Sequence, residues 1–142
     1  MRVVIGSDLS GFHLKAPLIA ALDGWGYGVE DVGGYTPEWV DFPLIAERVC
    51  NALRDGRADR RVIVCGTGVG ACIAANKMPG IRAALCHDIH SAHQCVEHDF
   101  VTILCLGAKI VGEWLAQDLL KAGLLQSQAA VSMLKACRGK AA

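Results

Sequence analysis

Three glycines at alternate positions, Gly66, Gly68 and Gly70, give the sharpest chemical signal in the sequence. They follow the apolar run of residues 61–65 and precede small residues from Ala71 onward, a pattern that predicts a turn between a strand and a helix. Glycine lets the backbone approach a ligand, and N–H groups at the start of a helix can hold a phosphate or a developing oxyanion. The spacing is neither that of a dinucleotide fingerprint nor that of a nucleotide P-loop. A tight turn without a ligand is the alternative.

Cys65 stands directly before these glycines. A thiol near a helix N-terminus can have a lowered pKa and act as a base or a nucleophile, whereas the plainer interpretation is a buried cysteine that ends a strand. Thr67 is a hydroxyl within the same loop, and Asp8 follows the first apolar run, where it could bind a hydroxyl or cap the next helix. His98 comes after a predicted helix and before a strand, a place from which we expect it to reach a ligand.

Apolar runs alternate with helical patterns along the whole chain, which predicts βαβ units and a parallel sheet in one α/β domain over residues 1–142. The expected strands cover residues 2–6, 27–32, 61–65, 81–86 and 100–106. The expected helices cover residues 12–25, 41–54, 71–77, 88–97 and 113–125, with a last helix over about 126–138 that could pack on a partner subunit. Ligands of such a sheet bind beyond the carboxyl ends of its strands, where the polar residues named above gather.

Composition excludes several classes of protein. The chain has 142 residues, 53% hydrophobic and 20% charged, and its 14 basic and 14 acidic side chains cancel, which argues against disorder and against a nucleic-acid binder. No apolar run reaches the roughly 18 to 20 residues that cross a membrane, and the first run is too short for a signal peptide. The seven cysteines are an odd number without a Cys-x-x-Cys pair, which is typical of buried thiols in a reducing cytoplasm. We therefore expect a soluble cytoplasmic protein with no metal, no membrane and no nucleic-acid partner.

Several motifs together resemble the ribose-5-phosphate isomerase B / galactose-6-phosphate isomerase family. They are Cys-Gly-Thr-Gly-Val-Gly at residues 65–70, Ile-Ala-Ala-Asn-Lys at 73–77, Pro-Gly-Ile-Arg-Ala-Ala-Leu-Cys-His-Asp at 79–88, Ser-Ala at 91–92 and Leu-Gly-Ala at 106–108. Gly-Ser-Asp at residues 6–8, Gly-Phe at 11–12 and Asp-Phe-Pro at 41–43 match two further signatures, and the resemblance covers about residues 1–125.

The resemblance implies a Rossmann-like three-layer αβα sandwich with a five-stranded parallel sheet, in a homodimer or homotetramer whose active sites form across the subunit interface. It also implies aldose–ketose isomerisation through a cis-enediolate without metal or cofactor. Cys65 would move the proton between C1 and C2, because the glutamate that another branch uses is replaced by Ala71. Thr67 and His98 would assist ring opening, and Asp8 would hold substrate hydroxyls. The backbone N–H groups of the loop would stabilise the enediolate oxygen; they belong to Gly66, Gly68, Val69 and Gly70.

The chain departs from the family pattern where the substrate phosphate binds. Leu9 replaces a histidine, Asp99 replaces an asparagine that faces the substrate, and an ungapped alignment puts Ser132 and Ala136 at the positions of two arginines. Lys109 stands where an arginine is common, and Lys135 or Arg138 could take over after a shift. The proton-transfer residues are thus kept, whereas most of the bidentate phosphate recognition is missing.

Three functions follow from this asymmetry. The sequence favours an isomerase of the ribose 5-phosphate/ribulose 5-phosphate type, with Lys109 and other basic residues at the phosphate. The first alternative is an isomerase of an unphosphorylated or differently anchored sugar. The second is a non-catalytic subunit of a hetero-oligomeric isomerase, against which the joint presence of Cys65, Thr67 and His98 argues.

Overall fold

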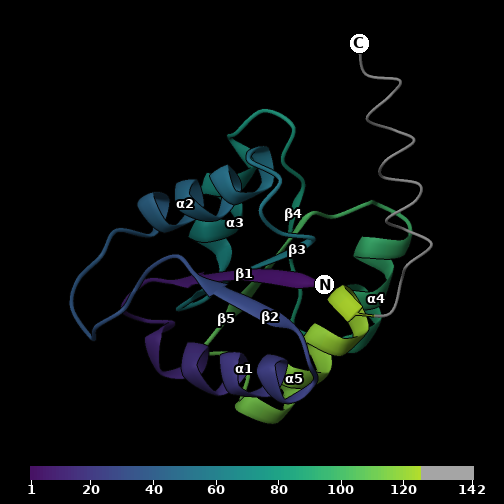
Figure 1. Ribbon diagram of the computed structural model, residues 1–142, viewed down its shortest axis with the longest axis horizontal. Coiled ribbons are helices and arrows are strands. Elements are labelled where there is room, and N and C mark those ends of the chain that lie inside the picture. Colours follow the sequence, from purple (N-terminus) through teal and green to yellow (C-terminus); the bar gives the residue numbers. More distant parts are fainter. Residues whose placement is uncertain (126–142) are drawn as a thin grey trace.

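The computed structural model describes residues 1–125 as a five-stranded parallel sheet between two layers of helices (Figure 1). The predicted helix over about 126–138 lies outside the described residues. The strands are β1 (Arg2–Ser7), β2 (Gly28–Asp31), β3 (Arg60–Cys65), β4 (Ala83–Leu85) and β5 (Ile103–Gly107). This arrangement confirms the predicted Rossmann-like αβα sandwich.

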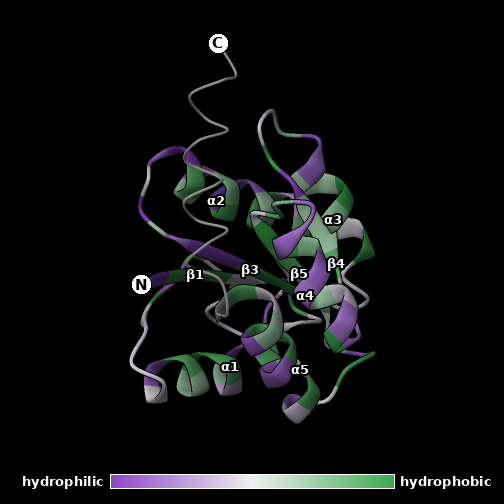
Figure 2. Ribbon diagram, turned by 90° about the vertical axis from the view of Figure 1, so that its right-hand side faces the viewer, coloured by the Kyte–Doolittle hydropathy of each residue, from purple (hydrophilic) through white to green (hydrophobic). Residues whose placement is uncertain are grey.

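Six helical segments connect and follow the strands: α1 (Phe12–Gly24), α2 (Phe42–Arg54), α3 (Val69–Asn76), α4 (Ile89–Glu97), α5 (Glu113–Leu120) and the short π-helix Lys121–Leu125. One apolar core joins the sheet to α1, α4 and α5, and the other joins it to α2 and α3. The helices carry both hydrophobic and hydrophilic stretches, as a buried and an exposed face require (Figure 2). Among the described residues, the helices are too short or too polar to cross a bilayer.

In the strand order β2-β1-β3-β5-β4, the direction in which successive strands are added to the sheet reverses between β1 and β3. From β1 the chain moves outward to β2, and it then crosses back to β3 on the other side of β1. The register pairs Ser7 with Val64, so the ends of these two central strands lie side by side. Crevices at such a switch point are where open α/β sheets bind ligands. The fold therefore places the residues that follow β1 and end β3 at this position.

Element boundaries differ from the predictions mainly near the loops. Helix α3 begins at Val69 rather than at Ala71, so Val69 and Gly70 belong to its first turn. Strand β5 begins at Ile103 rather than at residue 100, because Phe100 has a φ of 55°, in the left-handed region that no strand uses. The N–H groups of a helix's first turn have no partner within the helix, so the change at α3 adds the N–H groups of Val69 and Gly70 to those that face the loop rather than the helix.

Candidate active site

Asp8 and Cys65 form a buried pair at the switch point. The Cys65 thiol donates a hydrogen bond to Oδ2 of Asp8 at 3.1 Å, and Oδ1 of Asp8 accepts the backbone N–H of Gly11 at 2.9 Å. Cys65 is 8% exposed and Asp8 9%. The turn that holds Asp8 needs glycine at position 11, because a Cβ there would lie 2.2 Å from the carbonyl oxygen of Val64. Sequence reasoning named both partners but not the contact between them.

The environment of Cys65 has opposing effects on its thiol. Burial raises the pKa most, and the hydrogen bond and negative charge of Asp8 raise it further, whereas the N–H groups of Gly68 and Gly66 lower it. The net pKa lies above the ordinary thiol value. Of the two interpretations that the sequence left open for Cys65, a lowered pKa and a buried cysteine at the end of a strand, the structure favours the buried cysteine, although the loop donors do lower the pKa in part. At neutral pH Cys65 is therefore a neutral thiol.

The loop after Cys65 is fixed by backbone geometry. Gly68 has a φ of 79° and precedes α3 as its N-cap. A Cβ at this position would lie 2.5 Å from Cδ1 of Leu85 and 3.0 Å from the backbone carbonyl carbon of Leu106, so both conformation and space require glycine. The loop is therefore packed onto the ends of β4 and β5, which holds its N–H groups in place.

Two side chains flank the same loop. Thr67 is exposed, and its hydroxyl accepts the N–H of Val69 at 3.4 Å, a local bond that keeps Oγ1 at the mouth of the site. The ring of Phe42 covers Gly70, where a Cβ would lie 3.0 Å from two ring carbons. Sequence reasoning assigned Phe42 only to a matching signature, and its contact with the loop depends on a tertiary approach of α2 to α3.

Lys109 and Ser10 lie over Gly66. The Lys109 N–H donates to the carbonyl oxygen of Gly66 at 2.9 Å, and the stem of Lys109 passes 3.8 Å from the place that a Gly66 Cβ would take. The Ser10 side chain lies 3.2 Å from the same place. Lys109 is exposed and Ser10 half-buried. The structure therefore brings the stem of an exposed lysine and the hydroxyl of a serine to the loop, and Ser10 is a neighbour that the sequence analysis missed.

His98 and Asp99 lie at the other end of the sheet. His98 caps the C-terminus of α4, and both residues are exposed and precede β5. The five-residue strand β5 ends at Gly107, which pairs with Cys65. At about 3.3 Å per residue, roughly 13 Å of strand separates the two ends. Within one chain, therefore, the structure does not bring His98 or Asp99 to Cys65.

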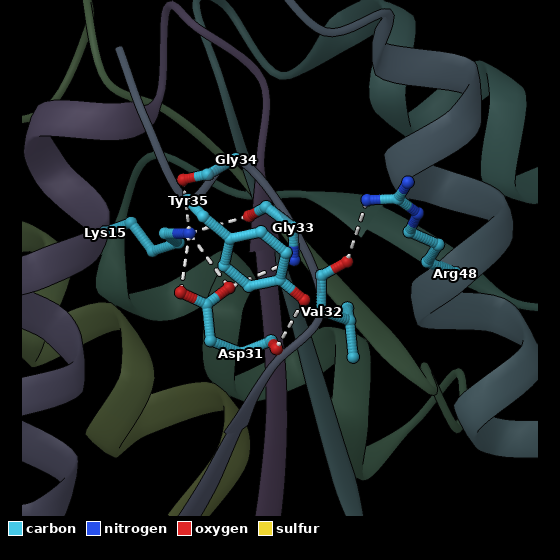
Figure 3. A network of polar contacts seen from close by, with 7 residues as sticks. All are labelled: Lys15, Asp31, Val32, Gly33, Gly34, Tyr35 and Arg48. Carbon is cyan, nitrogen blue, oxygen red and sulfur yellow. Dashed lines mark hydrogen bonds and ion pairs between the residues drawn. The ribbon is translucent and has the colours of Figure 1, made fainter. Parts of the chain in front are cut away.

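A second buried polar group lies beside β1, at Lys15 of α1 (Figure 3). Its Nζ donates to Oδ1 of Asp31 at 2.8 Å and to the carbonyl oxygens of Gly33 and Gly34 at 2.6 and 2.7 Å. It also lies 5.5 Å from the centre of the Tyr35 ring. These contacts join α1 to the loop after β2, and this loop leads to Phe42.

The open hollow next to this network is not at Cys65. It encloses about 520 Å³ between β2 and α2, and its lining includes Asp31, Tyr35, Arg48 and Arg57. Arg48 donates to the carbonyl oxygen of Val32 at 3.4 Å, and Arg57 pairs with Glu30. We place the chemistry at Cys65 rather than in this hollow, because the carboxylates that line the hollow are already paired with Lys15 or Arg57.

Metal binding finds no support in the described residues, which contain no group of three His, Cys, Asp or Glu side chains that could hold an ion. The histidines on α4 behave as a helix surface: Nδ1 of His93 lies 3.2 Å from Oε2 of Glu97, one turn later. The site built by Asp8, Cys65 and the glycine loop thus offers a proton acceptor, a thiol and converging N–H donors.

The chain as a whole is similar to known isomerases. The family model described as Ribose/Galactose Isomerase matches residues 3–130. The chain belongs to this family. D-erythrulose-4-phosphate isomerase 2 from Mycolicibacterium smegmatis is 40% identical over 124 residues, which are 85% of this chain and 82% of that protein. The 4-deoxy-4-sulfo-D-erythrose isomerase of a Clostridium species is 35% identical over 136 residues, covering 89% and 83% of the two chains.

A solved structure shows the same architecture over the whole length. Ribose-5-phosphate isomerase B from Clostridium thermocellum superposes with a TM-score of 0.86 at 38% identity, covering 100% of each chain. The family confirms the predicted activity class, an aldose–ketose isomerase.

Proposed function

We propose that the protein interconverts the aldose and ketose forms of a small sugar phosphate, of the ribose 5-phosphate/ribulose 5-phosphate type, with Cys65 as the base. The observation that supports this most is the Cys65–Asp8 contact of 3.1 Å beside the N–H donors of the glycine loop. A base next to preorganised donors is what proton transfer through an enediolate requires. The names of the relatives with phosphate in their substrates support the same class.

In this mechanism the sulfur of Cys65 removes the proton from C2 of the open-chain aldose, and the electron pair of that C–H bond forms the enediolate. The charge that develops on O1 is held by N–H groups at the start of α3: that of Gly70, and that of Val69 once it turns from the Thr67 hydroxyl to the substrate. The thiol then returns the proton to C1, while a proton passes from O2 to O1. Thr67, whose hydroxyl lies at the mouth of the site, assists ring opening.

A second copy of the chain completes the site. His98 and Asp99 can reach a substrate at Cys65 only from another subunit, because β5 separates them within one chain. Exposed apolar side chains stand around the carboxyl edge of the sheet, as an interface there would need. They are Val69, Ile73, Ile110 and Trp114. The proposal is a homodimer or homotetramer, and the free thiols of the described residues support a cytoplasmic location.

The anionic end of the substrate lies over Gly66 in this proposal, at the Lys109 ammonium and the Ser10 hydroxyl. A specific observation also favours the second candidate, an isomerase of a sugar without a phosphate. Leu9 removes a donor that the family places there, and a relative is named for a substrate that carries a sulfo group instead. A single lysine is a point charge and accepts a sulfonate or a phosphate equally, whereas paired arginines select by bidentate geometry.

Proton exchange in D2O tests this proposal. The protein is incubated with ribose 5-phosphate, erythrulose 4-phosphate, a four-carbon sulfo-sugar and unphosphorylated pentoses, tetroses and hexoses, and NMR follows deuterium at C1 and C2. Fast exchange with a phosphate alone is the expected result. Exchange with the sulfo-sugar or a free sugar instead would establish the second candidate. If none of the sugars took up deuterium, both candidate functions would be contradicted, and the non-catalytic subunit would be favoured.

A further inference from the structure

The carboxylate of Asp8 is already committed before any substrate arrives. Its Oδ1 accepts the N–H of Gly11 at 2.9 Å and its Oδ2 accepts the thiol of Cys65 at 3.1 Å. Only 9% of the residue is exposed. A side chain in this position presents little of its surface to a sugar hydroxyl, which is the role that the family resemblance gives it. Its one side-chain hydrogen-bond partner among the described residues is the thiol of Cys65.

Cys65 needs a proton acceptor. Burial and Asp8 raise the pKa of the thiol, so the free enzyme holds a neutral S–H group, and a neutral thiol cannot remove a proton from carbon. Cys105, a buried thiol that interacts electrostatically with Cys65, has a pKa raised well above its usual value, so it takes up no proton at neutral pH. Nε2 of His87 already accepts the N–H of Gly107, the sheet partner of Cys65, at 3.1 Å. Oδ2 of Asp8, by contrast, already accepts the hydrogen bond of the Cys65 thiol.

We infer that Asp8 accepts the thiol proton of Cys65 during the isomerisation, so that the base acting on the substrate is the thiolate of a Cys65–Asp8 pair. This inference rests on the proposed function and deepens it. The S–H bond breaks, an O–H bond forms on Oδ2, and the electron pair remains on sulfur. The thiolate then takes the C2 proton and returns it to C1, after which Oδ2 gives its proton back to sulfur. No oxidant or additional reactant is needed.

The glycine loop favours this transfer. Loss of water under a bound substrate disfavours the carboxylate and the thiolate alike, so the hydrogen-bond donors around the sulfur decide where the proton lies. The N–H groups of Gly66 and Gly68, which already point to the sulfur, stabilise the thiolate that forms. Asp8 thus acts through Cys65 rather than on the sugar.

Asp8→Asn is the decisive variant. An amide oxygen still accepts the Gly11 N–H, so the turn is kept, but an amide cannot take up the thiol proton. We expect kcat to fall roughly 100-fold or more while KM stays within about threefold. The variant also loses the charge that raises the Cys65 pKa, so alkylation of Cys65 by iodoacetamide should begin at lower pH than in the parent. Activity and thiolate formation therefore change in opposite directions.

The alkylation is followed on the Cys65 peptide by mass spectrometry in a Cys72→Ser background, because Cys72 is more exposed and more acidic. Asp118→Asn is the matched control, since Asp118 is an exposed aspartate on α5 outside the site. It should change neither rate nor pH profile. Circular dichroism checks that each variant is folded.

Three results would overturn the inference: an Asp8→Asn enzyme with kcat within fivefold of the parent, a loss confined to KM, or an unchanged pH profile of Cys65 alkylation. The second would return Asp8 to the role of a substrate ligand. The alkylation profile requires no substrate, so it decides the coupling of Asp8 and Cys65 even if the proposed isomerisation fails on every sugar tested.

Discussion

Two buried polar clusters lie beside β1, one around Lys15 and one around Cys65. They differ in how many of their polar groups already have a hydrogen-bond partner. Lys15 has carboxylate and carbonyl partners for its ammonium group, at distances of 2.6 to 2.8 Å. Cys65 has one hydrogen-bond acceptor, Asp8, and the N–H groups of its loop converge on a sulfur that is still protonated. The Lys15 cluster has no remaining capacity for a ligand, whereas the Cys65 cluster gains its best interactions only after a proton has moved. The two clusters thus differ in how completely their polar groups are hydrogen-bonded: those around Lys15 are, whereas those around Cys65 are not until the thiol loses its proton.

Replacing Cys65 by alanine should show the largest difference between the two clusters, because it should affect activity far more than stability. Loss of the base should lower isomerisation by roughly 10²- to 10⁴-fold, as followed by deuterium incorporation. The free energy of unfolding should change by only about 1 kcal/mol, because one sulfur atom is removed and Asp8 keeps the Gly11 N–H. Cys50→Ala is the matched control, since Cys50 is also fully buried but belongs to α2. If both variants lost activity equally, the assignment of Cys65 as the base would be wrong.

Lys15→Met should have the opposite effects to Cys65→Ala: a large loss of stability and little change in activity. The methionine fills similar space but leaves Asp31 and two carbonyl groups without their donor, which should cost about 2 to 4 kcal/mol in urea unfolding at fixed protein concentration. The lower part of this range applies if water reaches Asp31, whose side chain is 28% exposed. At a temperature where the variant is folded, kcat should stay within roughly threefold, because Lys15 contacts neither Cys65 nor its loop.

The double variant Lys15→Met/Asp31→Asn supplies the control for this experiment. It removes the uncompensated charge, so part of the lost stability should return. A stability of Lys15→Met equal to that of the parent would contradict the assignment of a structural role to this cluster. A large loss of kcat in the folded variant would instead show that the clusters are not independent.

The sequence predicted the positions of the elements well because hydrophobic patterns are local. The βαβ alternation, the strand that ends at Cys65 and the glycine loop all follow from short-range composition. The Asp8–Cys65 contact could not be predicted in this way, since it joins residues 57 positions apart and depends on strand order. Once the switch point between β1 and β3 is known, the contact follows directly, because both residues stand at the ends of these neighbouring strands.

The Lys15 cluster and the position of His98 could not be predicted from the sequence either, because both depend on how distant elements are arranged. A lysine on an amphipathic helix is ordinarily exposed, and nothing local shows that Lys15 meets the carbonyls of Gly33 and Gly34. His98 was expected near the ligand because it precedes a strand. The amino end of a parallel strand is, however, the end away from the site, so His98 does not approach Cys65 within one chain.

Cys72 gives a smaller test, which uses thiol chemistry to ask whether Asp8 controls Cys65. Cys72 stands on the other side of the glycine loop, half-buried on α3. Its pKa is lowered to about 7, chiefly by the hydrogen bond from the Cys105 thiol and further by Asn76, against the effect of burial. At pH 7 roughly half of Cys72 is therefore thiolate, whereas Cys65 remains a thiol.

Limited iodoacetamide treatment at pH 7 should accordingly label Cys72 well before Cys65, and lowering the pH by two units should suppress its labelling because the thiolate is then protonated. Peptide mass spectrometry reports both sites in one sample. Asn76→Ala removes one stabilising donor, so it should move the labelling of Cys72 to higher pH and leave Cys65 unchanged. If Cys65 were labelled first, its thiol would already be ionised in the free enzyme. Asp8 would then have no proton to accept. The groups around Cys65 would already make their best interactions before substrate binds, as those around Lys15 do.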